Sequence, residues 1–83
     1  MFVGKVVGNL VSTQKLGKLV GYKLLLVELD EPKQTIVAVD TIGAGQGATV
    51  LLVVGSSARA ALGDDSVPVD ASVVGIVDLM ERG

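Results

Sequence analysis

The chain has 83 residues, of which 49% are hydrophobic and 19% are charged, and its formal net charge is −2. This length suits one domain over residues 1–83, which buries only about 60% of the surface that its unfolded chain exposes. The net charge offers no attraction to phosphate backbones, which argues against a nucleic-acid partner. A mean hydropathy of +0.63 is high for so small a core, so we expect part of the apolar surface to face another subunit.

Two apolar segments near the start of the chain predict the first two strands. The first is expected over residues 2–11, followed by a polar loop at Ser12–Lys15, and the second is expected over residues 21–29. A turn should follow at residues 30–33, because Pro32 has no N–H to donate to a strand ladder. Closely spaced strands with turn residues between them indicate a β-meander.

A glycine-rich loop separates the third and fourth predicted strands, which we expect over residues 35–39 and 49–54. This glycine loop, residues 43–47, can adopt positive φ or let another backbone approach closely. A dinucleotide-binding loop has to follow a strand and open a helix, whereas this loop precedes a strand and has a different glycine spacing. A tight turn or a close subunit contact is the favoured interpretation.

In the last third of the chain, the residue pattern predicts one short helix and a fifth strand. Residues 56–63 provide Ser56 as a cap, alanines that favour helix, and Gly63 as a stop, which indicates one or two helical turns. The fifth strand is expected over residues 72–80.

Three of the predicted strands, the second, fourth and fifth, are apolar on both faces. A strand in an open sheet with one solvated face would carry polar side chains at its outward positions. Doubly apolar strands instead fit a small closed barrel whose outside is covered by neighbouring subunits. In the fifth strand the two alternating sets are Val73, Val77 and Leu79 on one face and Val74, Ile76 and Met80 on the other.

Two residue types that often support catalysis, His and Cys, are missing from the chain. With neither His nor Cys, it lacks the commonest general base, the thiol nucleophile and the usual zinc ligands, so we expect no enzyme activity and no cofactor. Asp64 and Asp65 could bind a hard metal ion, but a solvated turn before Pro68 is favoured because nearby oxygen atoms lack the spacing of a binding loop. The alternative function is an OB-type binding module for nucleic acid or carbohydrate. Two aromatics, Phe2 and Tyr22, are few for base stacking.

No segment has the length of a membrane-spanning helix, which needs roughly 20 consecutive apolar residues. The longest compact apolar run, residues 50–54, has the length of a strand and stops at Gly55. The opening residues Met1–Lys5 do not show a basic region followed by an apolar core and a cleavage site. We therefore expect a cytoplasmic location and no membrane partner.

Five segments stand in order along the chain: Gly8–Lys15, Leu19–Leu24, Val37–Gly47, Gly55–Arg59 and Asp70–Asp78. Together they resemble the EutN/CcmL family of vertex proteins from bacterial microcompartment shells, and the resemblance extends over nearly the whole chain. The resemblance implies an all-β fold, a small five-stranded OB-like β-barrel with one short helix. It also implies a homo-oligomer, a pentamer at the five-fold vertices of a shell in the cytoplasm, with hexameric shell proteins as partners.

Three groups of residues are candidates for contacts in such an assembly. The glycine loop has little side-chain bulk and could pack at a subunit interface or beside a central opening. The start of the predicted helix could also face a neighbour, and three lysines could meet other shell proteins, although solvated charge is the simpler interpretation of these lysines. The sequence does not distinguish a ring of five subunits from a ring of six, and it does not identify the reaction inside the compartment. The candidates are Gly43, Ala44, Gly45, Gln46 and Gly47 in the loop, Ser56, Ser57 and Arg59 in the helix, and Lys15, Lys18 and Lys23.

Overall fold

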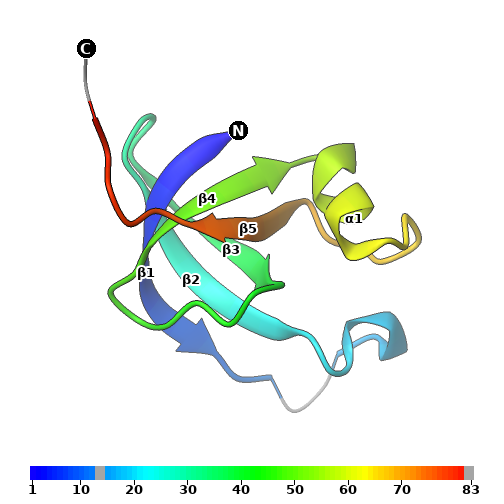
Figure 1. Cartoon of the computed structure of the whole chain (residues 1–83). Helices are drawn as coiled ribbons and strands as arrows, with labels where there is room; N and C mark the ends of the chain where they lie inside the picture. The colour runs from blue at the N-terminus through cyan, green and yellow to red at the C-terminus, as the bar shows by residue number, and fades with distance from the viewer. Residues whose placement is uncertain (13–14, 82–83) are drawn as a thin grey trace.

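The computed structural model describes residues 1–12 and 15–81. It confirms the expected fold class, since five strands form a closed barrel with one short α-helix at its side (Figure 1). Part of the predicted polar loop, Thr13 and Gln14, lies outside the described residues. The elements are β1 (Phe2–Leu10), the 3-10 helix η1 (Gly17–Leu19), β2 (Lys23–Leu29), β3 (Gln34–Asp40), β4 (Thr49–Val54), α1 (Ser56–Leu62) and β5 (Ala71–Ile76).

The order of the strands around the barrel is β1-β2-β3-β5-β4, with β4 closing on β1. The predicted meander is therefore wrong beyond β3. The glycine loop carries the chain across one end of the barrel, so that β4 pairs with β1 rather than with β3. The gap between β3 and β4 is filled by β5, which is parallel to β3 and antiparallel to β4.

The fifth strand is shorter than the predicted 72–80. It ends at Ile76 because its partner β4 begins at Thr49, whose carbonyl accepts the last bond of this pairing from Val77 N–H, at 2.8 Å. Leu79, in the segment that follows, is 73% exposed.

The short helix ends as predicted but begins differently. Gly63 adopts the left-handed conformation at the C-cap, and its N–H donates to the carbonyl of Ala60. The predicted cap by Ser56 is wrong, because the N-cap is Gly55, with φ of 65°, and no side chain caps this end. None of the helices in the described part of the chain is both long and apolar enough to cross a membrane.

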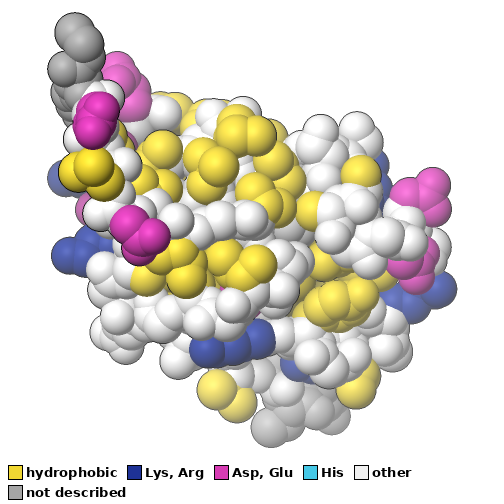
Figure 2. Space-filling view, in the orientation of Figure 1, with side chains coloured by type: hydrophobic (Ala, Val, Ile, Leu, Met, Phe, Trp, Pro, Cys, Tyr) yellow, Lys and Arg dark blue, Asp and Glu magenta, His cyan; other side chains and the backbone are white. Residues whose placement is uncertain are grey.

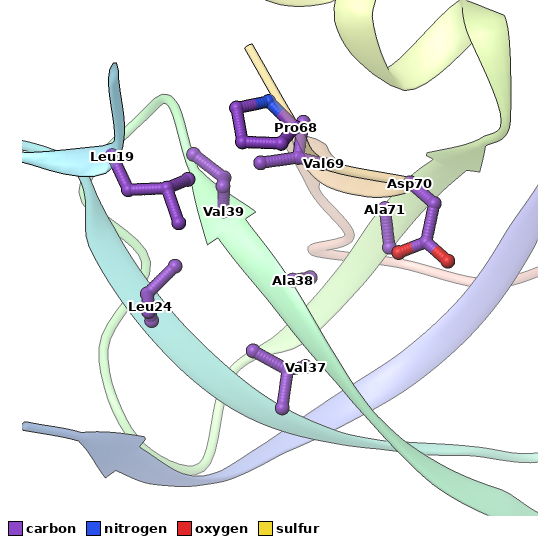
Figure 3. A pocket seen from close by; sticks show the side chains of 9 residues that line it. All are labelled: Leu19, Leu24, Val37, Ala38, Val39, Pro68, Val69, Asp70 and Ala71. Carbon is purple, nitrogen blue, oxygen red and sulfur yellow. The ribbon is translucent and has the colours of Figure 1, made fainter. Parts of the chain in front are cut away.

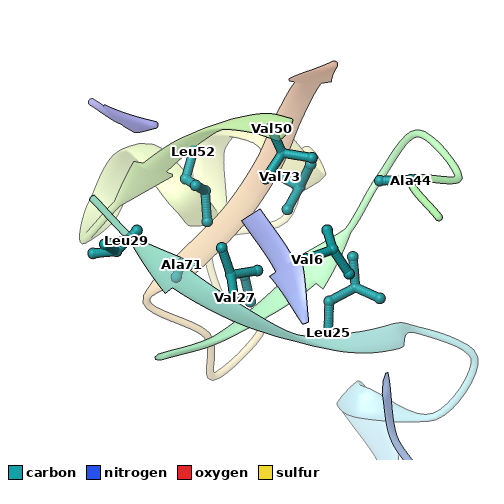
Figure 4. Packing of buried hydrophobic residues seen from close by; sticks show 10 residues of the cluster. Val6, Leu25, Val27, Leu29, Ala44, Val50, Leu52, Ala71 and Val73 are labelled. Atoms are coloured by element: carbon teal, nitrogen blue, oxygen red, sulfur yellow. The ribbon is translucent and has the colours of Figure 1, made fainter. Parts of the chain in front are cut away.

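The barrel interior is filled by aliphatic side chains that alternate with outward ones along each strand. Figure 4 shows these side chains converging from all sides of the barrel. At Gly4 the interior is so tightly packed that an added Cβ would lie 2.7 Å from Val27 Cγ1. The buried Ser72 hydroxyl donates to the carbonyl of Ala58 at 2.9 Å and ties α1 to β5. The hydrophobic residues with no exposed surface are Val6, Leu25, Val27, Ala44, Val50, Leu52, Ala58 and Val73.

Candidate subunit-contact surfaces

The glycine loop is fastened to β1 and closes one end of the barrel. Gly47 N–H donates to the carbonyl of Val6 at 2.8 Å, and Val6 N–H donates to the carbonyl of Ala48 at 2.9 Å. Ala44 is fully buried and belongs to the core cluster, so its side chain fills the barrel of its own chain (Figure 4). The other four candidate residues, Gly43, Gly45, Gln46 and Gly47, are exposed.

Side-chain hydrogen bonds hold the entrance to the loop. One carboxylate oxygen of Asp40 accepts from the N–H groups of Ile42 and Gly43, at 3.0 and 2.9 Å. The Thr41 hydroxyl donates to the carbonyl of Val73 on β5 at 2.6 Å. Gly43, with φ of 81°, adopts the left-handed conformation that disfavours other residues. The loop therefore has a defined shape within one chain, and its place at a subunit contact stays a prediction.

Gly45 provides a clean test of that prediction. Its φ is not left-handed and no atom would lie within 4 Å of an added Cβ, so a larger side chain there has room within the chain. We expect Gly45→Val to keep the strand signal in circular dichroism while impairing ring assembly, measured by light scattering after gel filtration. Gly45→Ala, with less bulk, is the matched control and should assemble better. Full-sized rings from Gly45→Val would contradict the interface assignment.

The helix candidates divide into two kinds. Ser56 and Ser57 are exposed at the start of α1 and are open to a neighbour. The Arg59 guanidinium is half-buried and donates to the carbonyl of Val69 in its own chain at 3.2 Å. This bond holds α1 against the segment that leads into β5, and an interface role for Arg59 stays a prediction.

The three lysine candidates, Lys15, Lys18 and Lys23, are all exposed. Near Lys18, Asp64 accepts hydrogen bonds from the hydroxyl and the amide of Ser66, at 2.6 and 3.0 Å. These bonds, with a smaller contribution from the charge of Lys18, lower the pKa of Asp64. Asp64 thus stabilises the turn that it shares with Ser66. Among the described residues, no group of three or more Asp, Glu, His or Cys side chains could hold a metal ion.

The outer face of β2 and β3 is aliphatic, as predicted for β2. Leu24 stands opposite Val39, and Leu26 stands opposite Val37, in the antiparallel register. Leu25 on β2 belongs to the core cluster, so these four neighbours point away from it. We call Leu24, Leu26 and Val37 the β2–β3 face, because Val39, at 1% exposure, is already covered within its own chain. Val37 is 43% exposed, which leaves a large aliphatic side chain in contact with solvent.

A hollow of about 160 Å³ lies beside this face. Leu19 from η1 and Pro68 and Val69 from the segment before β5 form its walls (Figure 3). A second groove, of about 590 Å³, shares Val37 with the hollow and continues towards the turn at Pro32. No local pattern in the sequence signals either feature, because their walls come from segments far apart in the chain.

The outer face of β4 and its neighbours is also aliphatic. Leu51 on β4 stands opposite Val3 on β1, and the absence of a side chain at Gly75 on β5 leaves the other flank of Leu51 open. Beyond Gly75, Ile76 is 48% exposed. Val3 and Leu51 form this outer face, whereas Ile76 stands opposite the buried Val50 and does not share it. Figure 2 shows hydrophobic side chains gathered over β4 and β5.

A small closed barrel with aliphatic side chains on two outer faces is what we expect of a barrel module that assembles with further chains. The family described as "Ethanolamine utilisation protein EutN/carboxysome" matches residues 1–78. The chain belongs to this EutN/CcmL family.

Individual relatives match the chain from end to end. The microcompartment shell vertex protein GrpN of Rhodospirillum rubrum is 49% identical over 98% of this chain and 97% of its own length. The structure of that species' pentameric shell protein GrpN has a TM-score of 0.88 with complete coverage of both chains. The structure of CcmL from Gloeobacter violaceus has a TM-score of 0.90 at 44% identity, covering 99% of this chain and 90% of that one.

Proposed function

We propose that five copies of this chain form a ring that occupies the five-fold vertices of a bacterial microcompartment shell in the cytoplasm. The observation that carries the proposal is the end-to-end match to a pentameric shell protein, over the barrel, the helix and the glycine loop alike. The aliphatic outer faces support it, because solvated aliphatic strands in so small a domain are stabilised when other copies cover them.

The proposed role is structural rather than catalytic. A flat layer of hexagonal tiles cannot curve into a closed polyhedron without five-fold corners, and a ring of five small barrels supplies such a corner. The partners would be hexamer-forming shell proteins, whose edges meet the rim of the ring. The exposed Lys15, Lys18 and Lys23 are candidates for that rim.

The mass of the purified protein tests this proposal directly. Five chains of 8.4 kDa give a particle of about 42 kDa, and light scattering after gel filtration should find that mass. A monomer at working concentration would contradict the proposal. A ring of six chains, about 50 kDa, would keep the ring but contradict the five-fold vertex role.

We further propose that the ring does not bind nucleic acid, in contrast to single-strand binders with an OB-type barrel. A net charge of −2 and two aromatic residues give little basis for phosphate attraction or base stacking. Fluorescence anisotropy with a labelled single-stranded DNA at physiological salt should show no saturable binding at micromolar protein. Saturable binding in that range would contradict this part of the proposal.

A further inference from the structure

One edge of β3 is paired over only part of its length. On the other edge, β2 pairs with every residue of β3 from Gln34 to Asp40. β5 pairs with Val39 and Asp40 alone, so within the described part of the chain residues 34–38 have no partner strand on this edge. Backbone N–H and C=O groups of alternate residues point to opposite edges of a strand, and an unpaired edge is a template for a further strand.

This open edge lacks the side chains that usually protect one. Natural proteins place charged residues or proline on an exposed edge, or cover it. Residues 34–38 read Gln-Thr-Ile-Val-Ala, without a charge or a proline. The edge is also not covered, because the groove of about 590 Å³ is lined by Gln34 and Ile36 of β3 and by Val54 and Asp70 across from them. The edge is therefore accessible to a strand from outside the barrel.

The groove and the hollow serve the two faces of this edge. Ala38 belongs to the core cluster and Ile36 packs against it, so Val37 between them points outwards. The groove takes in the inward-pointing Ile36 and Phe2, whereas the hollow takes in the outer Leu24, and Val37 lines both (Figure 3). Because side chains alternate along a strand, adjacent residues of a strand added here would point into the groove and into the hollow in turn.

A single carboxylate stands beside both spaces. Among the described residues that line the groove or the hollow, Asp70 carries the one charge, and it borders both. A basic side chain next to aliphatic ones complements such a site. The exposed end of a second copy of this chain suits it less well, because residues 77–83 carry Asp78 and Glu81 against one arginine.

We propose that the open edge of β3 binds an extended segment of another protein, one that carries adjacent aliphatic residues next to a lysine or arginine. Backbone hydrogen bonds to residues 34–38 would add this segment to the barrel as a strand and supply affinity, while the groove and the hollow select its aliphatic side chains. The basic residue meets Asp70. The inference goes beyond the proposed function, because a ring of identical chains needs no strand from another protein.

A capped fluorescent peptide, Thr-Lys-Val-Leu-Val-Thr, tests the proposal on the wild-type ring. We expect saturable binding in fluorescence anisotropy and slower hydrogen exchange at the amides of residues 34–38. Two further probes carry N-methyl groups on one or the other set of alternate residues. One of them should bind about tenfold more weakly or worse, and the other should bind like the parent, because one set of N–H groups faces β3. Equal affinity of the two methylated probes would contradict an added strand.

Variants of the protein locate the bound peptide. Val37→Lys should abolish binding, because the new side chain occupies both spaces and repels the lysine of the probe. Val7→Lys is the matched control, since Val7 is 37% exposed, similar to Val37, and lines neither space. Asp70→Asn should weaken binding by up to about fivefold, the range of an exposed ion pair, and should bind a probe with norleucine in place of lysine equally well. Full affinity in Val37→Lys would place the peptide elsewhere.

The outcomes separate this inference from the proposed function. Wild-type rings that bind no probe, with residues 34–38 already protected from exchange, would show that a neighbouring copy covers the edge. That result would overturn the inference and leave the vertex role standing. A wild-type chain that stays monomeric and binds the parent probe at this edge would overturn the proposed ring and leave the inference standing.

Discussion

A strain that lacks this chain should still make shell facets but should fail to close them. In the proposed assembly the facets are held together by contacts between hexagonal tiles, which do not involve the vertex ring. Without the ring the facets should form sheets, tubes or unsealed bodies, because hexagonal tiles alone cannot form five-fold corners. Electron micrographs should show these forms, and a diffusible intermediate of the enclosed pathway should leak into the medium while enzyme activity in lysates is unchanged.

Complementation makes this experiment specific to assembly. The wild-type chain should restore closed polyhedra and retention of the intermediate, and Gly45→Val should restore neither if the glycine loop lies at a subunit contact. Closed shells with normal retention in the deletion strain, with no second vertex gene present, would contradict the vertex role.

Replacing Gly4 by alanine should strongly destabilise the barrel. The new Cβ would lie 2.7 Å from Val27 Cγ1 and 2.9 Å from the backbone carbonyl oxygen of Glu28. The side chain can rotate, but the carbonyl belongs to the β1–β2 ladder, where Gly4 stands opposite Leu29, and can retreat only if the strands separate. Overpacking of this kind costs roughly 1–3 kcal/mol, a large share of the roughly 5–15 kcal/mol that stabilises a small domain.

Urea denaturation at fixed protein concentration measures this effect. We expect the unfolding midpoint of Gly4→Ala to fall clearly below that of the wild type, with monomer and ring populations checked by light scattering. Gly17→Ala is the control, because Gly17 has no neighbouring atom within 4 Å of an added Cβ and no left-handed φ. An unchanged midpoint for Gly4→Ala would mean that β1 and β2 can separate at this point at little cost.

Local patterns along the chain were enough to predict the elements of the barrel. Apolar, β-branched runs separated by Gly, Asp and Pro turn residues located all five strands. Because glycine readily adopts the left-handed conformation that ends helices, Gly63 correctly predicted the end of α1. Aliphatic residues on both sides of β2 indicated a closed barrel with covered outer faces, and the five family segments indicated the class of assembly.

The tertiary structure alone decided which strands pair and where the contact surfaces lie. An apolar run bounded by turn residues indicates a strand but carries no information about its partner strand, so the insertion of β5 between β3 and β4 was missed. Burial of Ala44 depends on the path of the glycine loop across the barrel end, and no neighbouring residue signals it. The hollow beside Val37 likewise exists because Leu19 and Val69, far apart in the chain, fold onto the same face.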